Sequence, residues 1–228
     1  MSIHIGLLVF PDITQLDMTG PYEVFTKFPD ARVHLLWKHT DPISVAGGMQ
    51  IIPTTRFDQC PQLDVICVPG GSGMNALLED TETLDFIRRQ AAGARYVTSV
   101  CTGSLVLGAA GLLSGKRATT HWMSHDMLAE LGAIPVAERV VVDGNLITGG
   151  GVTAGIDFAL RLAAQMLGEA AARQIQLGIE YDPRPPFDSG HPASCDAALV
   201  EQVRTAAAAR QQERAAAVGR AAARLGDA

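Results

Sequence analysis

The stretch that decides the fold is YVTSVCTGSLVLG, at residues 96–108. Its first half is apolar and β-branched, which is typical of a buried strand, and its second half is rich in small residues and favours a helix. Cys101 stands where the halves meet, with Ser99 and Gly103 two residues away on either side. A sharp strand-to-helix turn needs small residues at those two positions, as in the nucleophile elbow of serine hydrolases. The pattern predicts an α/β enzyme with Cys101 as its nucleophile.

The rest of the chain alternates predicted strands with predicted helices. We expect strands at 3–10, 31–39, 64–68, 96–100 and 118–121, a hairpin at 140–148, and a second hairpin on the sheet's edge within 45–55. We expect helices from Pro21 onward and at 75–92, 124–131, 153–167, 169–178 and 193–225, with irregular chain at 181–192. This alternation favours a mainly parallel sheet with helices on both faces. With no repeat or long linker, residues 1–228 are expected to form one domain, in which 193–228 is an alanine-rich helical extension.

Composition and charge argue against a nucleic-acid partner and against a membrane span. The net charge of −6 disfavours nucleic acid as a partner. Five arginines at 204–224 leave a nucleic-acid arm open, but no aromatic residues interleave with them, so a solvated or subunit-contacting helix is favoured. The apolar run at 3–10 is too short to span a membrane and lacks a charged leader, so we expect a cytoplasmic protein.

The cysteine and histidine spacings do not indicate a metal site or a cofactor. The four cysteines lie far apart and form neither a zinc motif nor a disulfide framework. His121 and His125 are four residues apart, a spacing that can bind metal on a helix, but no third ligand lies near them. We therefore expect no metal and no cofactor.

Three strand exits are candidates for the site around Cys101, because sites in such sheets lie beyond the carboxyl ends of the strands. After the first strand, Asp17 is either the proton partner of the cysteine or a helix cap. After the third, the Gly70–Gly71 turn offers amides for developing negative charge, together with Thr102, or is an ordinary turn. The helix that follows Cys101 should favour its thiolate. His121 is either an imidazole partner or a structural residue.

Several spaced motifs in one order resemble the PfpI/ThiJ-like superfamily, relatives of the class I glutamine amidotransferase domain. These motifs are FPD at 10–12, LDMTGPYEVF at 16–25, VPGGSG at 68–73, VCTG at 100–103 and ATTHW at 118–122. The resemblance implies a flavodoxin-like three-layer sandwich that is usually dimeric. It also implies that the amides of Gly71 and Thr102 face Cys101, and it makes Gly70, His121 and Trp122 candidates for the pocket.

Two departures from the superfamily pattern narrow the expected reaction. Protease-like and amidotransferase members have histidine directly after the nucleophile, where this chain has Thr102. Many members have glutamate in the first strand-exit loop, where Asp17 stands here. Asp17 at this place, together with the TGPYEVF run at 19–25 and the TTHW segment at 119–122, most resembles isocyanide hydratases. It implies a homodimer that hydrates an isonitrile to an N-substituted formamide through a cysteine thioimidate, with Asp17 carrying the proton.

Three alternatives stay open from the sequence. The same cysteine suits a small-molecule or redox sensor, and it suits glyoxalase-like or deglycase-like chemistry on carbonyl compounds. The sensor domains of AraC-type regulators share much of the pattern, but they carry a helix-turn-helix region that does not follow here.

Overall fold

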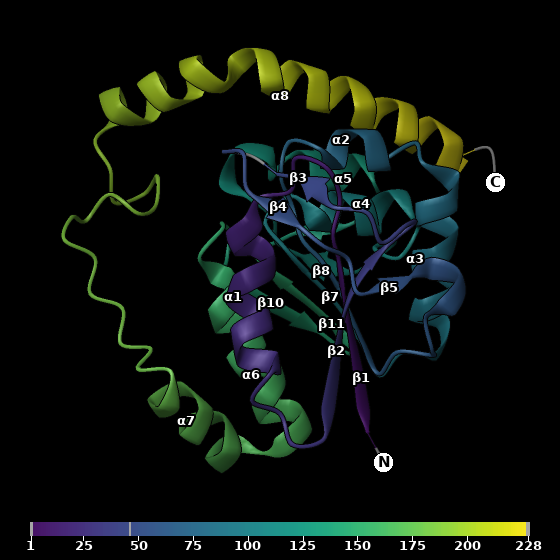
Figure 1. The fold of residues 1–228 in the computed structure, drawn as a ribbon. Helices are drawn as coiled ribbons and strands as arrows, with labels where there is room; N and C mark the ends of the chain where they lie inside the picture. The colour runs from purple at the N-terminus through teal and green to yellow at the C-terminus, as the bar shows by residue number, and fades with distance from the viewer. Residues whose placement is uncertain (1, 46, 227–228) are drawn as a thin grey trace.

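The computed structural model describes residues 2–45 and 47–226, and it is organised around a seven-stranded sheet (Figure 1). The strand order is β10-β11-β7-β6-β1-β2-β5. Every neighbouring pair is parallel except β10 and β11, which form an antiparallel hairpin. The bounds are β1 Ile3–Leu8, β2 Ala31–Trp37, β5 Thr55–Arg56, β6 Val65–Val68, β7 Tyr96–Val100, β10 Val140–Asp143 and β11 Leu146–Gly149. The expected mainly parallel sheet is confirmed.

Helices cover both faces of the sheet. On one face α1 (Gln15–Phe25) packs against α6 (Ala154–Leu167), which continues into α7 (Glu169–Gly178). On the other face lie α3 (Thr81–Gly93) and α4 (Gly103–Ala109), with the short helices α2 (Met74–Leu77) and α5 (Met127–Glu130) near them (Figure 1). Strands β6 and β7 are buried almost throughout, as continuous apolar runs between two helix layers should be. The fold is the flavodoxin-like three-layer sandwich.

Helix α1 begins earlier than the sequence indicated. Pro21 was expected in its first turn, with Thr19 or Gly20 as the cap, but the helix starts at Gln15 and contains Pro21. The proline is accommodated by tertiary packing, because its ring lies against Gly155 of α6, where a Cβ would come within 2.9 Å of the ring. The earlier start puts Asp17 in the first turn of α1, fully buried.

Other differences from expectation are local. The hairpin of β3 (Ile43–Ser44) and β4 (Gln50–Ile51) forms a separate two-stranded sheet, while β5 occupies the main sheet's edge. The helix expected at 75–92 is split before Asp80, whose carboxylate accepts a hydrogen bond from the Thr83 N–H and caps α3. Strand β8 (Arg117–Ala118) pairs with β9 (Ile134–Pro135), and a 3₁₀ turn at Trp122–Ser124 precedes α5.

The C-terminal helix α8 (Ala197–Gly226) crosses the molecule above α2, α4 and α5 (Figure 1). It starts four residues later than expected, where Asp196 accepts a hydrogen bond from the Leu199 N–H. Small side chains on its inner face are buried, namely Ala207, Ala217, Val218 and Ala221.

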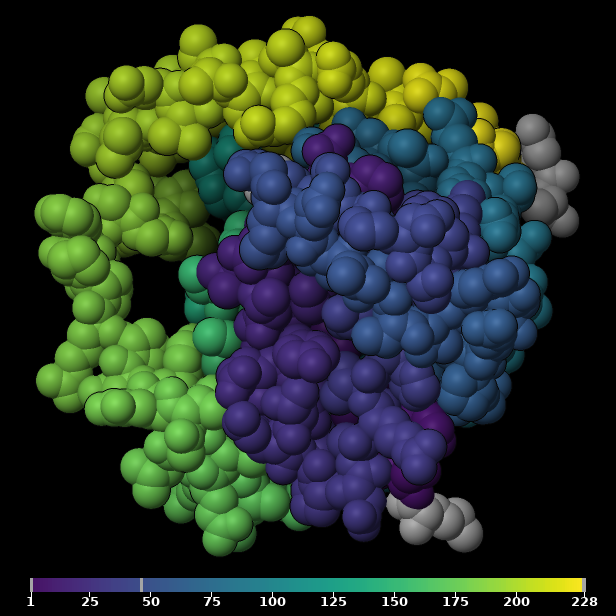
Figure 2. All heavy atoms as spheres, in the orientation of Figure 1, coloured from purple at the N-terminus to yellow at the C-terminus, as the bar shows by residue number. Residues whose placement is uncertain are grey.

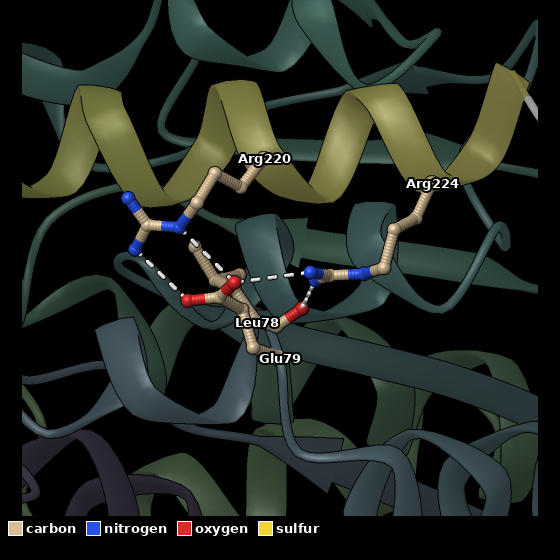
Figure 3. Close-up of polar contacts among 4 residues, drawn as sticks. All are labelled: Leu78, Glu79, Arg220 and Arg224. Atoms are coloured by element: carbon tan, nitrogen blue, oxygen red, sulfur yellow. Dashed lines mark hydrogen bonds and ion pairs between the residues drawn. The ribbon is translucent and has the colours of Figure 1, made fainter.

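Two arginines anchor the far end of α8. Figure 3 shows Arg220 and Arg224 converging on the Glu79 carboxylate, at N–O distances between 2.9 and 3.0 Å. Arg224 also donates to the Leu78 carbonyl at 2.6 Å. One face of this helix is therefore packed on the core, while most of its residues are solvent-exposed, as composition favoured; the subunit contact stays a prediction.

None of the described helices combines the length and apolar character that crossing a membrane requires.

Candidate active site

Cys101 lies at the apex of the turn between β7 and α4 with a φ of 55°. This left-handed conformation is unfavourable for a residue with a side chain and persists only where the surroundings hold it. The Cys101 N–H donates to the carbonyls of Gly149 and Gly150 at 3.1 and 2.8 Å. Its carbonyl accepts a 2.8 Å hydrogen bond from Thr120 Oγ1. The elbow is thus fixed by backbone from β11 and by the segment after β8.

Gly103 shows why the small-residue pattern matters. A Cβ at this position would lie 1.9 Å from the Val68 carbonyl oxygen, which is far inside van der Waals contact. Only glycine lets α4 begin this close to the end of β6.

The three expected strand exits meet at this elbow. The Thr14 N–H donates to the Gly70 carbonyl at 3.0 Å, and the Gly70 N–H donates to Asp17 Oδ2 at 2.9 Å. The Gly71 N–H donates to Thr102 Oγ1 at 3.2 Å. The loops after β1, β6 and β7 are therefore joined by direct hydrogen bonds.

Asp17 is a fully buried carboxyl beside the Cys101 thiol. Burial raises the pKa of Asp17 to about 7, although hydrogen bonding from Gly70 and the neighbouring thiol act in the opposite direction. Its Oδ1 atom is buried without a hydrogen-bond partner among the described residues. A carboxyl with a pKa near neutrality can both accept and release a proton at pH 7.

The resting state of Cys101 differs from expectation. The sulfur-bearing side chain is buried, and burial followed by the adjacent Asp17 raises the thiol pKa above its ordinary value. The Thr102 N–H and Arg214 act in the opposite direction but are outweighed. The Thr102 N–H thus acts in the direction predicted for the start of this helix, but burial and Asp17 favour the thiol in the free protein. Helix α4 spans only seven residues, and its N-terminus cannot offset desolvation and a carboxylate together.

The two amides predicted to face the sulfur have different partners. The Thr102 N–H interacts with the Cys101 sulfur, whereas the Gly71 N–H is engaged by the Thr102 hydroxyl. Thr102 therefore connects the Gly71 turn to the elbow.

A cavity of about 300 Å³ opens beside Cys101. It is lined by Thr14, Gly71, Ser72, Cys101, Thr102, His121, Met123, Val152, Arg210, Gln211 and Arg214. Of the candidates for the pocket, His121 lines this cavity, whereas Gly70 lies behind it against Asp17. Trp122 stacks on His121 with ring centroids 6.0 Å apart and lies under the Arg204 guanidinium, outside the lining.

The wall contributed by α8 was missed by sequence reasoning. Arg210, Gln211 and Arg214 all come from this helix. The excess of arginine at 204–224 was the only signal, and composition alone does not indicate which face of a helix is buried.

His121 belongs to this wall as a neutral imidazole. Burial lowers its pKa, and the charges of Arg214 and Arg210 lower it further. Its Nδ1 accepts a hydrogen bond from the Met123 N–H at 3.3 Å. Among residues 2–45 and 47–226, no three histidine, cysteine or carboxylate side chains are grouped so that they could hold a metal ion.

Comparison with known proteins identifies the family of the chain over most of its length. Residues 4–165 match the model of the DJ-1/PfpI family. The chain is 60% identical over 225 residues to isonitrile hydratase from Pseudomonas putida, covering 99% of both proteins. It superposes on a ThiJ/PfpI family protein from Pseudomonas syringae with a TM-score of 0.93 and 42% identity, covering 96% of this chain and 91% of the other.

A more distant structure shares the central fold. Drosophila melanogaster DJ-1beta superposes with a TM-score of 0.70 and 26% identity, covering 79% of this chain and 98% of that one. The resemblance drawn from the five sequence motifs is confirmed, and the chain belongs to the DJ-1/PfpI family.

Proposed function

We propose that this protein hydrates isonitriles to N-substituted formamides, with Cys101 as the nucleophile and Asp17 as the proton carrier. The observation that carries the proposal is the pair itself: a cysteine held at a φ of 55° beside a buried carboxyl whose pKa is about 7. The identity of 60% to an isonitrile hydratase supports the reaction class.

The first half of the reaction uses the pair as a thiol and a carboxylate. The Cys101 sulfur attacks the terminal carbon of R–N≡C while Asp17 takes the thiol proton. Asp17 then gives this proton to the same carbon, which yields the thioimidate R–N=CH–S–Cys101. Transfer of the proton as the S–C bond forms removes the need for a resting thiolate, in keeping with the raised pKa of Cys101.

The second half uses Asp17 as a base and then as an acid. The carboxylate takes a proton from water as the oxygen adds to the thioimidate carbon, and it passes this proton to the nitrogen. Collapse of the tetrahedral intermediate breaks the C–S bond, releases R–NH–CHO and returns the hydroxyl proton to sulfur through Asp17. One isonitrile and one water give one formamide, and both side chains are restored.

Thr102 supports hydration over amide hydrolysis. Its N–H interacts with the sulfur and stabilises negative charge there when the C–S bond breaks. A histidine at this position would supply the proton for an amine leaving group, and threonine does not.

The test is formamide production from an aryl isonitrile by the purified chain. We expect Cys101→Ala to abolish turnover and to prevent the mass increase of a trapped thioimidate. Asp17→Asn should lower kcat by about a hundredfold or more, the usual size of a general acid–base contribution. Formation of lactate from methylglyoxal, without formamide from isonitriles, would contradict the proposal and favour glyoxalase chemistry.

The pH profile gives a second test of the same proposal. Because attack requires the Asp17 carboxylate, kcat/KM should fall as the pH drops through about 7. A profile that is flat across this range would remove Asp17 from the attack step.

We further propose that residues 1–228 form one domain that assembles as a homodimer in the cytoplasm, where thiols stay reduced. Residues 181–196 form an arm that stands away from the body, and Figure 2 shows an open gap between them. Leu177, on α7 before this arm, and Phe187, within the arm, are 82% and 77% exposed. Light scattering that gives the mass of a monomer at micromolar concentration would contradict the dimer.

A further inference from the structure

Arg214 is a buried guanidinium that faces the Cys101 cavity, and no carboxylate of residues 2–45 and 47–226 pairs with it. Its side chain is only 5% exposed. Its Nε donates to Asn75 Oδ1 at 3.3 Å and its Nη1 donates to Ser124 Oγ at 3.1 Å, while Nη2 makes no hydrogen bond to any described residue. Buried charges are usually paired, because desolvation of an isolated ion is unfavourable. Arg214 therefore keeps one nitrogen free for a group that enters the cavity.

Arg210 brings a second positive charge to the same wall. It lies one helical turn before Arg214, lines the cavity and forms no ion pair with any residue in the described ranges. Like charges four residues apart on a helix repel each other. Burial is the main cause of the lowered pKa of Arg214, and the charge of Arg210 contributes to it. An anion between the two side chains would relieve this repulsion.

Nothing else in the cavity wall balances these charges. Apart from the two arginines, the lining side chains are hydroxyl, amide, thiol, imidazole or apolar, and none is acidic. Asp17 is not among the lining residues, and its Oδ2 accepts the hydrogen bond from the Gly70 N–H. The neutral His121 adds no charge of either sign.

We propose that the preferred substrates are isonitriles that carry a carboxylate, which Arg214 and Arg210 bind while the isonitrile carbon reaches Cys101. This inference rests on the proposed hydration and names its substrate class. The cavity volume of about 300 Å³ suits a small aryl or alkyl isonitrile. A guanidinium offers parallel N–H donors that match a carboxylate, and such charge-assisted bonds are stronger than neutral ones. Arg214 and Arg210 thus act as specificity residues.

The experiment compares acids with their neutral esters. The probes are 4-isocyanobenzoate and 3-isocyanobenzoate, each against its methyl ester, because the two isomers place the carboxylate differently. We expect the better acid to exceed its ester in kcat/KM by about tenfold or more, mainly through a lower KM. Equal kcat/KM values for acid and ester, or higher values for both esters, would overturn the inference. Because formamide would still be produced, the proposed function would stand in that case.

Three variants connect the preference to the arginines. Arg214→Met and Arg210→Met should each lower the acid-to-ester ratio, whereas Arg214→Lys should keep part of it. Arg204→Met is the matched control, since Arg204 is on the same helix but lies over Trp122, outside the cavity, and it should keep the wild-type ratio. If Arg214→Met does not fold, the acid-to-ester ratio of Arg210→Met is the test, because Arg210 is exposed and its replacement should leave the fold intact. An unchanged ratio in Arg210→Met and in every folded Arg214 variant would refute the assignment.

A binding measurement separates this inference from the proposed reaction. Calorimetry with 4-formamidobenzoate and its methyl ester requires no turnover. If no isonitrile is hydrated, the proposed function fails, but tighter binding of the acid that is lost in Arg210→Met would still support the carboxylate site. Equal binding of acid and ester would reject it.

Discussion

Replacing Asp17 by asparagine is expected to stabilise the folded protein at pH 8, although it should lower kcat of the proposed hydration by about a hundredfold or more. The pKa of Asp17 rises from 3.8 to about 7 in the fold. That difference of about three units, at about 1.4 kcal/mol per unit, means that the ionised carboxylate destabilises the folded state by about 4 kcal/mol above pH 7. Asparagine carries no charge, and its oxygen can still accept the Gly70 hydrogen bond.

The gain is reduced by the amide nitrogen of the new side chain. This nitrogen would replace Oδ1, which has no hydrogen-bond partner among the described residues, and a buried unpaired donor costs about 1–3 kcal/mol. Subtracting this cost from the gain of about 4 kcal/mol leaves an expected net stabilisation of about 1–3 kcal/mol at pH 8.

The pH dependence tests the reasoning more sharply than the size of the effect. Between about pH 4 and pH 7 the unfolded chain has released the Asp17 proton while the folded chain keeps it. Wild-type stability therefore falls by about 1.4 kcal/mol per pH unit relative to Asp17→Asn, and the difference levels off above about pH 7. Near pH 4.5 the variant should be no more stable than wild type.

Urea unfolding of both proteins across this pH range measures the difference directly. Asp41→Asn serves as the control for loss of a charge, because the Asp41 side chain is 87% exposed. A difference that does not change with pH, or one that changes in the opposite direction, would refute burial as the cause of the raised pKa.

Three further outcomes follow from the structure. Cys101→Ser is expected to retain the fold yet lose hydration by at least a hundredfold, which formamide assays and circular dichroism check together. Gly103→Ala should destabilise by about 1–3 kcal/mol or more, since its Cβ would meet the Val68 oxygen at 1.9 Å; Gly219→Ala, with nothing within 4 Å, should not. Glu79 has a pKa lowered to about 2 by Arg220 and its neighbour Arg224. Hydrogen exchange at 216–226 should therefore be faster in Glu79→Gln at pH 7, and this difference should vanish as the pH falls from about 4.5 toward 2.

The elbow could be predicted from sequence because its constraint is local. The residues two positions from Cys101 must be small because a strand turns sharply into a helix there. At Gly103 the reason is the Val68 carbonyl oxygen, which a Cβ would approach to 1.9 Å. The parallel strands were predictable for a similar reason, since strands covered on both faces read as continuous apolar runs. Asp17 was identified as a candidate from its place after the first strand, although the start of its helix was not.

Features that depend on distant packing were not predictable. Pro21 lies inside α1 only because Gly155, from a helix far along the chain, leaves room for its ring. The net ionisation of Cys101 could not be read from the sequence, because a helix N-terminus is visible there, whereas burial and a carboxyl from another loop are not. In both cases the deciding contact comes from a segment that is distant in the sequence.

The proposed chemistry and the proposed substrate selection are assigned to two different parts of the chain that line one cavity. Cys101, Asp17 and Thr102 lie within residues 4–165, the range that matches the DJ-1/PfpI family model. Arg210 and Arg214 lie beyond that range, on α8, yet they line the same cavity. Helix α8 is held at its far end by Glu79 and along its length by small apolar side chains, and Arg214 adds hydrogen bonds to Asn75 and Ser124 through Nε and Nη1. Under the proposed function, Nη2 of Arg214 and the guanidinium of Arg210 are available to a ligand, and changes on α8 would alter which isonitrile is bound without moving Cys101 or Asp17.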